Sequence, residues 1–228
     1  MLSIKHINLV GTIHSEGGLA AARKQGAILN AAEFRADMLP HLADSTALRK
    51  LSTPIIWTVR CATEGGRETG SLNHRVALYE AGFDVARLVD VELSSVKKLK
   101  STLLAAKSQR CKLIYSFHDF QSTPPISNLR RIARRAEDGG ADIVKIATVV
   151  DSLESLSRLM EVFNFSLKVP LAVMGMGRFG KVSRLLCAQA GSVLNYGWLD
   201  RPQVTGQWSA AELAARFEDL NIKRPKVR

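Results

Sequence analysis

The chain has 228 residues, 46% of them hydrophobic, and its Lys and Arg outnumber its Asp and Glu by 32 to 21, giving a net charge of +11. No apolar run reaches the roughly 18 residues that a membrane span needs, so we expect no membrane protein. The three cysteines, Cys61, Cys111 and Cys187, are widely spaced and form no CxxC pair, which argues against a disulfide framework or a structural zinc site. The N-terminus also lacks the long apolar region of a signal peptide, so we expect a protein of the reducing cytoplasm.

The positive charge is compatible with nucleic-acid binding, with an anionic membrane surface, or with solubility alone. The basic residues are scattered along most of the chain, with few aromatic residues among them. Proteins that bind single-stranded nucleic acid combine the two residue types. We therefore expect no nucleic-acid partner, and a small anionic substrate is an alternative use of the charge.

Eight short apolar runs, each suited to a strand, alternate with amphipathic stretches. In chain order the predicted strands are 7–14, 28–37, 54–61, 85–93, 112–120, 142–150, 169–177 and 192–199. Between most of them apolar residues recur at helical spacing, as at Val96, Leu99 and Leu103; the stretch 39–53 shows no clear pattern. Asp151 or Ser152 is expected to cap the helix after the sixth strand.

This alternation predicts an α/β fold, namely a single-domain (β/α)8 TIM barrel over residues 1–228. An open doubly wound sheet fits the pattern almost as well. No linker or change of composition divides the chain.

Lys145 is the most informative residue, because it interrupts the apolar run 141–150. A charge in such a strand is costly unless it is paired or used. Burial favours the uncharged amine, which attacks carbonyl carbon to form a Schiff base. His118 stands near the end of the preceding apolar run, one strand–helix–strand unit away. An amine and a proton shuttle on neighbouring strands would form a site.

Other polar residues also follow the ends of predicted strands, where a barrel gathers its chemistry. They are Glu33 and Arg35 at the second strand, Arg60 and Glu64 at the third, Asp90 and Glu92 at the fourth, Arg184 after the seventh and Gln207 after the eighth.

Each of these residues also has a structural explanation. Glu33 with Arg35, and Arg60 with Glu64, could form ion pairs, and His118 could be a hydrogen-bonded strand end. Asp90 and Glu92 are expected to be structural, and Arg184 lies on an amphipathic helix, where arginine is usually solvated. Their common position at one end of the barrel favours a site.

The segment Gly175–Met–Gly177–Arg–Phe–Gly180 satisfies GxGxxG but lies late in the chain, and it lacks the hydroxyl of a P-loop after Lys181. We expect no nucleotide there, and interpret the glycines as a loop whose amides receive an anion at a helix N-terminus. No metal-ligand spacing such as HExxH is present, so we expect no metal.

Taken together, the motifs resemble those of type I 3-dehydroquinate dehydratases, the Schiff-base enzymes of the shikimate pathway. The most specific are Ser-Phe-His-Asp-Phe around His118, with a following Thr-Pro, and Gly-Ala-Asp-Ile-Val-Lys-Ile-Ala around Lys145. The family's Glu-Trp-Arg, Arg-x-x-x-Glu-Gly-Gly, Met-Gly…Ser-Arg and Gly-Gln are similar to segments 33–35, 60–66, 174–184 and 206–207.

The resemblance implies a (β/α)8 barrel that acts on 3-dehydroquinate without metal or organic cofactor, and we expect a homodimer. It implies that Lys145 forms an iminium with the ring ketone, that His118 moves the protons, and that Glu64 orients His118. For binding of the substrate it implies the set Glu33, Arg35, Arg60, Arg184 and Gln207.

The chain departs from the family at 203–207, where Gln-Val-Thr-Gly-Gln replaces Ser-Ala-Pro-Gly-Gln. The substrate contact that the family's serine makes would be made here by Gln203 or Thr205. Two alternatives stay open: another Schiff-base lyase or aldolase on the same barrel, and a barrel that binds an anion without catalysis.

Overall fold

Eight parallel strands alternate with helices in the computed structural model, which describes residues 3–43, 46–67 and 70–227. The strands are β1 (Asn8–Ile13), β2 (Ala31–Arg35), β3 (Ile55–Thr58), β4 (Ala86–Glu92), β5 (Lys112–Asp119), β6 (Ile143–Val149), β7 (Leu171–Met176) and β8 (Leu194–Trp198). All eight predicted strands are therefore found. The second is the least accurate, because the residues before Ala31 include a short 3-10 helix.

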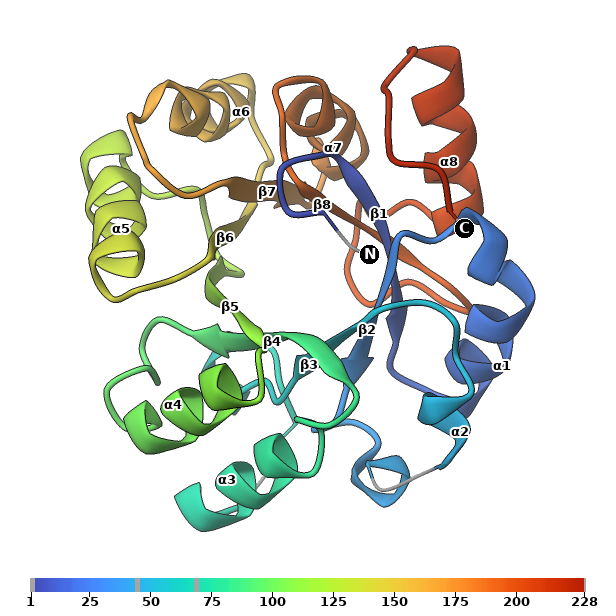
Figure 1. Cartoon of the computed structure of the whole chain (residues 1–228). Coiled ribbons are helices and arrows are strands. Elements are labelled where there is room, and N and C mark those ends of the chain that lie inside the picture. Colours follow the sequence, from blue (N-terminus) through green and yellow to red (C-terminus); the bar gives the residue numbers. More distant parts are fainter. Residues whose placement is uncertain (1–2, 44–45, 68–69, 228) are drawn as a thin grey trace.

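The strands follow one another in chain order around a barrel, and β8 pairs with β1 (Figure 1). Between β7 and the residues just before β8, the amide of Val193 donates to the carbonyl of Leu171 at 2.8 Å, and the Ser192 hydroxyl bonds the amide and the carbonyl of Val173. The sheet is thus nearly closed. The predicted (β/α)8 barrel is confirmed, and the open doubly wound sheet is not what forms.

Helices surround the barrel, one α-helix after each strand (Figure 1). They are α1 (Glu16–Gln25), α2 (Thr46–Arg49), α3 (Leu72–Glu80), α4 (Lys100–Ser108), α5 (Ile126–Asp138), α6 (Leu153–Met160), α7 (Gly180–Gln189) and α8 (Ala210–Asp219), with 3-10 turns η1 (Gly26–Ile28), η2 (Pro40–Leu42), η3 (Ala62–Glu64) and η4 (Glu161–Asn164). The unclear stretch 39–53 contains η2 and α2, and its residues 44–45 lie outside the described part. Of the two candidate caps of α6, Ser152 forms the capping box, whereas the Asp151 carboxylate accepts from the amide of Arg178.

Side chains alternate across each strand, which separates two apolar layers. On β6, Ile143 and Ala147 face the barrel interior, whereas Val144 and Ile146 pack against the helices. The interior is apolar at one end, where Val10, Ile56 and other side chains fill it. Lys145 shares the inward parity of Ile143, so the strand itself directs the lysine into the barrel.

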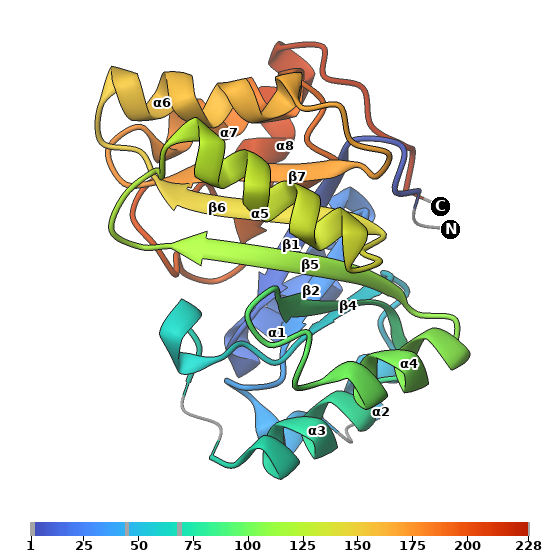
Figure 2. The ribbon, with the colours of Figure 1, turned by 90° about the vertical axis from the view of Figure 1, so that its left-hand side faces the viewer.

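The strands all point the same way, with the first and last described residues near their starting end (Figure 2). At the opposite end of the barrel lie the polar side chains that line a cavity. No helix in the described ranges is long and apolar enough to cross a membrane.

Candidate active site

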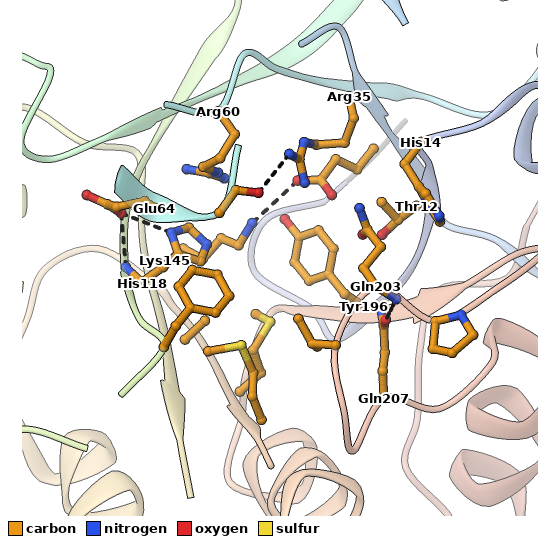
Figure 3. Close-up of a pocket in the computed structure, with 18 of the residues that line it drawn as sticks. Thr12, His14, Arg35, Arg60, Glu64, His118, Lys145, Tyr196, Gln203 and Gln207 are labelled. Carbon is orange, nitrogen blue, oxygen red and sulfur yellow. Dashed lines mark hydrogen bonds and ion pairs between the residues drawn. The ribbon is translucent and has the colours of Figure 1, made fainter. Parts of the chain in front are cut away.

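A cavity of about 500 Å³ opens at the carboxyl ends of the strands. Its lining includes all eight residues predicted for the site, namely Glu33, Arg35, Arg60, Glu64, His118, Lys145, Arg184 and Gln207. They come from β2, β5, β6 and α7, from the turn after β3 and from the loop before α8. Figure 3 labels Arg35, Arg60, Glu64, His118, Lys145 and Gln207 among them. The barrel thus brings together every predicted residue.

Lys145 lies at the centre of this cavity with its amine paired. Its Nζ donates to Asp90 Oδ2 at 2.9 Å and to Glu33 Oε1 at 3.4 Å, and it lies 4.2 Å from the ring centroid of Tyr196. The predicted Glu33–Arg35 ion pair does not form, because Glu33 faces the lysine. Asp90, expected to be structural, instead contacts the candidate nucleophile.

Asp90 also joins the lysine to a second buried cation. Arg60 contacts Asp90 Oδ1 at 2.9 Å, Glu92 Oε1 at 3.5 Å and Ser116 Oγ at 2.6 Å. Burial opposes ionisation of Asp90, yet Arg60 and Lys145 hold its pKa below the ordinary value. Arg60 is therefore not paired with Glu64, as one prediction had it, but stabilises a network of buried carboxylates under the cavity.

Glu64 is free to hold His118 instead. One oxygen, Oε2, lies 3.0 Å from the His118 Nδ1 and accepts from the His118 amide at 3.0 Å, while Ser94 donates to Oε1 at 3.0 Å. Gly66 closes the turn behind Glu64, where a Cβ would lie 2.0 Å from the Arg60 carbonyl oxygen. The two side chains are thus fixed relative to each other.

Burial shapes the protonation of this pair. It lowers the pKa of His118 well below 6.5, and the nearby Arg60 and Lys145 lower it further. Burial also raises the pKa of Glu64 to about 7, with Arg60 opposing the shift. A neutral imidazole can accept a proton, so His118 has the protonation state of a base at neutral pH.

Arg35 is held by a different carboxylate. Its Nε and Nη2 bind the two oxygens of Asp37 at 2.8 and 2.7 Å, and Nη2 also donates to the Gly65 carbonyl at 3.3 Å. Asp37 in turn accepts from the backbone amides of Arg60 and Arg67. Arg35 therefore ties β2 to the turn that carries Glu64 while lining the cavity.

Arg184 is buried rather than solvated, with 4% of its surface exposed. Its Nη1 donates to the Tyr196 carbonyl at 3.0 Å, its buried Nε has no partner, and no carboxylate of the described residues pairs with it. Burial lowers its pKa to about 10. A buried guanidinium without a counter-ion, facing a cavity, is suited to an incoming anion.

The loop between β8 and α8 covers one side of the cavity with Gln203 and Gln207 (Figure 3). Gln207 Oε1 accepts from the Gln203 amide at 3.0 Å, which leaves the Gln207 amide nitrogen for a ligand. Thr205 contributes its carbonyl to the amide of Gly177 at 3.0 Å. Of the two candidate replacements for the family's serine, only Gln203 is among the residues lining the cavity.

The interpretation of the 175–180 glycines as an anion-binding loop was wrong. The amide of Gly177 is bonded to Thr205 and that of Gly180 to Gly177. These glycines instead allow close approach, because a Cβ on Gly180 would lie 2.7 Å from the Gly206 carbonyl oxygen. The motif therefore packs the covering loop against the start of α7.

The sequence did not single out Thr12, His14 or Tyr196, which also line the cavity. Thr12 and Tyr196 lie two residues after the inward-facing Val10 and Leu194, so the alternation of side chains along β1 and β8 could have placed them in the barrel. His14 follows β1, where its buried Nδ1 has no partner and burial lowers its pKa. Among the described residues no group of three His, Cys, Asp or Glu side chains could hold a metal ion.

The barrel and its cavity define a class of protein: a (β/α)8 barrel with a buried amine, an oriented imidazole and an anion site at the carboxyl ends of its strands. The family model "Type I 3-dehydroquinase" matches residues 9–223, and the chain belongs to that family.

Individual relatives agree with this assignment. A 3-dehydroquinate dehydratase of Methanothrix thermoacetophila is 31% identical, covering 97% of this chain and 96% of the relative. The crystal structure of a type I 3-dehydroquinate dehydratase of Clostridium difficile, with covalently modified comenic acid, has a TM-score of 0.84 at 25% identity over 94% of this chain and 92% of that one. A deoxyribose phosphate aldolase of Aeropyrum pernix shares only the fold, with a TM-score of 0.61 at 15% identity over 96% of this chain and 92% of that one.

Proposed function

We propose that Lys145 carries the reaction of this enzyme as a Schiff base, with His118 as the group that moves protons. The overall reaction follows from the family: the chain is a 3-dehydroquinate dehydratase, a lyase that removes water from 3-dehydroquinate to give 3-dehydroshikimate in the shikimate pathway. The observation that carries the mechanism is the buried Lys145 amine, which shares one cavity with a neutral His118.

The steps follow from the chemistry of the two groups. The Lys145 amine condenses with the ring ketone to give an iminium, and the ketone oxygen leaves as water; the positive charge of the iminium acidifies the neighbouring C–H. His118 takes that proton to give an enamine, then returns it to the leaving hydroxyl as water departs. Hydrolysis releases 3-dehydroshikimate and the free amine. Glu64 orients the imidazole throughout, as a carboxylate does in a catalytic triad.

The remaining predicted residues would bind the substrate. Arg184 is suited to the substrate carboxylate, since it is a buried guanidinium that pairs with no carboxylate in the described part of the chain. Glu33, Arg35 and Arg60 would receive the ring hydroxyls, and the free amide nitrogen of Gln207 would close the loop over the substrate.

Covalent trapping tests the proposal. The protein is incubated with 3-dehydroquinate and borohydride, and the adduct is located by peptide mass spectrometry. We expect one adduct per chain on Lys145, and neither adduct nor turnover in Lys145→Ala. The covalently modified comenic acid of the Clostridium difficile relative is consistent with a reactive nucleophile in this family. If the protein forms the enone product, seen as a rise in its absorbance, without any adduct on Lys145, the Schiff-base mechanism would be overturned.

We also propose a cellular location, an oligomeric state and a domain organisation for this protein. We place it in the cytoplasm, because Cys61, Cys111 and Cys187 are all free. The protein is proposed to be a homodimer, since Leu153 on α6 and Val182 on α7 expose apolar side chains. Residues 1–228 are proposed to form a single catalytic domain. Light scattering on the purified protein measures the oligomeric state.

A further inference from the structure

Tyr196 is the third side chain in contact with the Lys145 amine, and neither the motifs nor the mechanism above uses it. It lies in β8, is 4% exposed and lines the cavity. Its ring faces the lysine, with 4.2 Å between Nζ and the ring centroid. Figure 3 shows it pointing into the cavity beside Lys145. Tyr196 therefore lies beside the position that the carbonyl carbon of the substrate must occupy when Lys145 attacks it.

The hydroxyl of Tyr196 is buried and has no hydrogen-bond partner in the described ranges. Buried polar groups in proteins are nearly always bonded. Tyr79, which is also buried, follows the rule, because its hydroxyl lies 3.1 and 3.0 Å from the carbonyl oxygens of Val59 and Asp90. An unpaired hydroxyl on a side chain that lines a polar cavity indicates a partner that arrives with the substrate or with water.

The surroundings of Nζ narrow the choice of partner. The ketone oxygen is bonded to the carbon that Nζ attacks, so it lies close to Nζ during the addition, when negative charge develops on it. Of the three side chains that contact Nζ, the carboxylates of Asp90 and Glu33 only accept, whereas Tyr196 can donate. A donor aimed at developing negative charge stabilises a transition state.

We infer that the Tyr196 hydroxyl donates a hydrogen bond to the ketone oxygen of the substrate while Lys145 adds to it. The inference rests on the proposed Schiff base and assigns Tyr196 to its formation, not to the later elimination. One proton of the Lys145 ammonium first passes to the Glu33 carboxylate, 3.4 Å away, which frees the nitrogen lone pair. The Nζ–C bond then forms as the carbonyl π pair moves to oxygen, and a second nitrogen proton moves to that oxygen to give a carbinolamine. Glu33 returns its proton to the hydroxyl as the nitrogen lone pair forms C=N and the C–O bond breaks, so both protons of the released water come from the lysine.

Tyr196 keeps its own proton in this step. Burial raises its pKa well above 10, and the charges of Glu33 and Asp90 raise it further. The hydroxyl is thus a donor at every working pH, and it binds the oxygen without transferring a proton to it.

Tyr196→Phe tests the assignment, because it removes the hydroxyl and leaves the ring under Lys145. Parent and variant are mixed with 3-dehydroquinate, quenched with borohydride at millisecond intervals, and the Lys145 adduct is quantified by mass. We expect the adduct to form about tenfold more slowly in the variant, the loss typical of one hydrogen bond. The isotope effect of substrate deuterated at the carbon that loses its proton should shrink, because addition becomes limiting. The melting temperature should not fall, since no protein bond is lost.

Tyr115→Phe is the matched control, because Tyr115 is as buried as Tyr196 but packs in the layer between barrel and helices. It should form the adduct at the parent rate. An equal adduct rate in parent and Tyr196→Phe would overturn the inference, as would a slower rate accompanied by a lower melting temperature. If the parent forms no adduct at all, the Schiff-base proposal itself fails, so the two failures are distinguishable.

Discussion

At the scale of single residues, the cavity contains two buried guanidinium groups with opposite surroundings. Arg60 contacts Asp90 and Glu92, which with Glu33 raise its pKa against the effect of burial. Arg184 pairs with no carboxylate of the described residues, and burial lowers its pKa to about 10. One arginine balances charges that belong to the protein, and the other is suited to a charge that the substrate brings.

This contrast predicts different costs for the same substitution. Arg184→Met should raise KM for 3-dehydroquinate by roughly 10- to 100-fold, as expected for the loss of a hydrogen bond to a charged group. Its free energy of unfolding should be unchanged or higher, because an unpaired buried charge is removed. Arg60→Met is the control and should cost about 3–5 kcal/mol of stability, since it leaves buried carboxylates unpaired. Denaturant unfolding and steady-state kinetics measure both. A strongly destabilised Arg184→Met would contradict the assignment.

His118 should be separable from formation of the Schiff base. In His118→Ala, borohydride should still trap the Lys145 adduct, because the amine is intact. Turnover should fall by ~10²–10⁴-fold, the usual contribution of a general acid–base group. The enone absorbance and the adduct mass are measured on the same sample. Full activity of this variant would remove His118 from the mechanism.

Glu64 should determine the acid limb of the pH profile. Its pKa of about 7 means that the carboxyl is protonated below that pH and ionised above it. Since the pKa of His118 is lowered, the imidazole is already neutral in this range. Activity should therefore rise with pH through about 7, as Glu64 ionises and accepts from the imidazole. Glu64→Gln should be at least about tenfold slower at pH 8 and should lose the rise near pH 7. A variant that keeps the rise would assign it to another group.

At the scale of elements, the sequence predicted what depends on periodicity and missed what depends on side-chain partners. The apolar run 141–150 marked Lys145 as a buried strand residue, and the strand ends placed the other predicted residues at the same end of the barrel. The pairing of Glu33, Arg60 and Asp90 was not predictable, because each had several oppositely charged candidates of similar separation. The role of the glycines at 175–180 was also not predictable, because the loop that packs against them lies about 30 residues further along the chain.

Gly206 tests the close contact between that loop and α7. It has a φ of +79°, and a Cβ there would lie 2.3 Å from the Gly177 carbonyl oxygen and 2.8 Å from the Cα of Gly180. Gly206→Ala should therefore displace the loop and Gln207, and we expect KM to rise by at least about tenfold, consistent with the loss of one or two hydrogen bonds.

Gly191→Ala is the matched control for backbone strain. Gly191 has a φ of +104° but no atom within 4 Å of an added Cβ. Both variants should lose about 1 kcal/mol from the left-handed conformation. Gly206→Ala should lose more stability than Gly191→Ala because of its backbone contacts, and only Gly206→Ala should raise KM. Equal KM values in the two variants would show that the contact does not position the loop.

At the scale of the whole molecule, the barrel collects groups from many strands and surrounds them with a basic surface. The net charge of +11 is not concentrated at the cavity, because Glu33 and Glu64 in its lining and Asp90 and Glu92 beneath it oppose the cations. Its attraction for an anionic substrate therefore acts mainly at a distance, before binding. Attraction of that kind is screened by salt, because the Debye length falls from about 10 Å at 0.1 M to about 3 Å at 1 M.

Salt should therefore lower kcat/KM more than kcat. Between 10 mM and 0.5 M NaCl we expect a fall of roughly 3- to 10-fold in kcat/KM, within the range of electrostatic steering effects, and a smaller change in kcat, because the buried groups are screened less. Arg201 lines the cavity, whereas Arg131 is exposed on α5, so Arg201→Gln and Arg131→Gln remove equal charge at different places. A larger loss of salt sensitivity in Arg201→Gln would locate the steering at the cavity mouth, and equal losses would assign it to the net charge. If kcat/KM of the parent does not change with ionic strength, the positive charge of the protein does not steer the substrate.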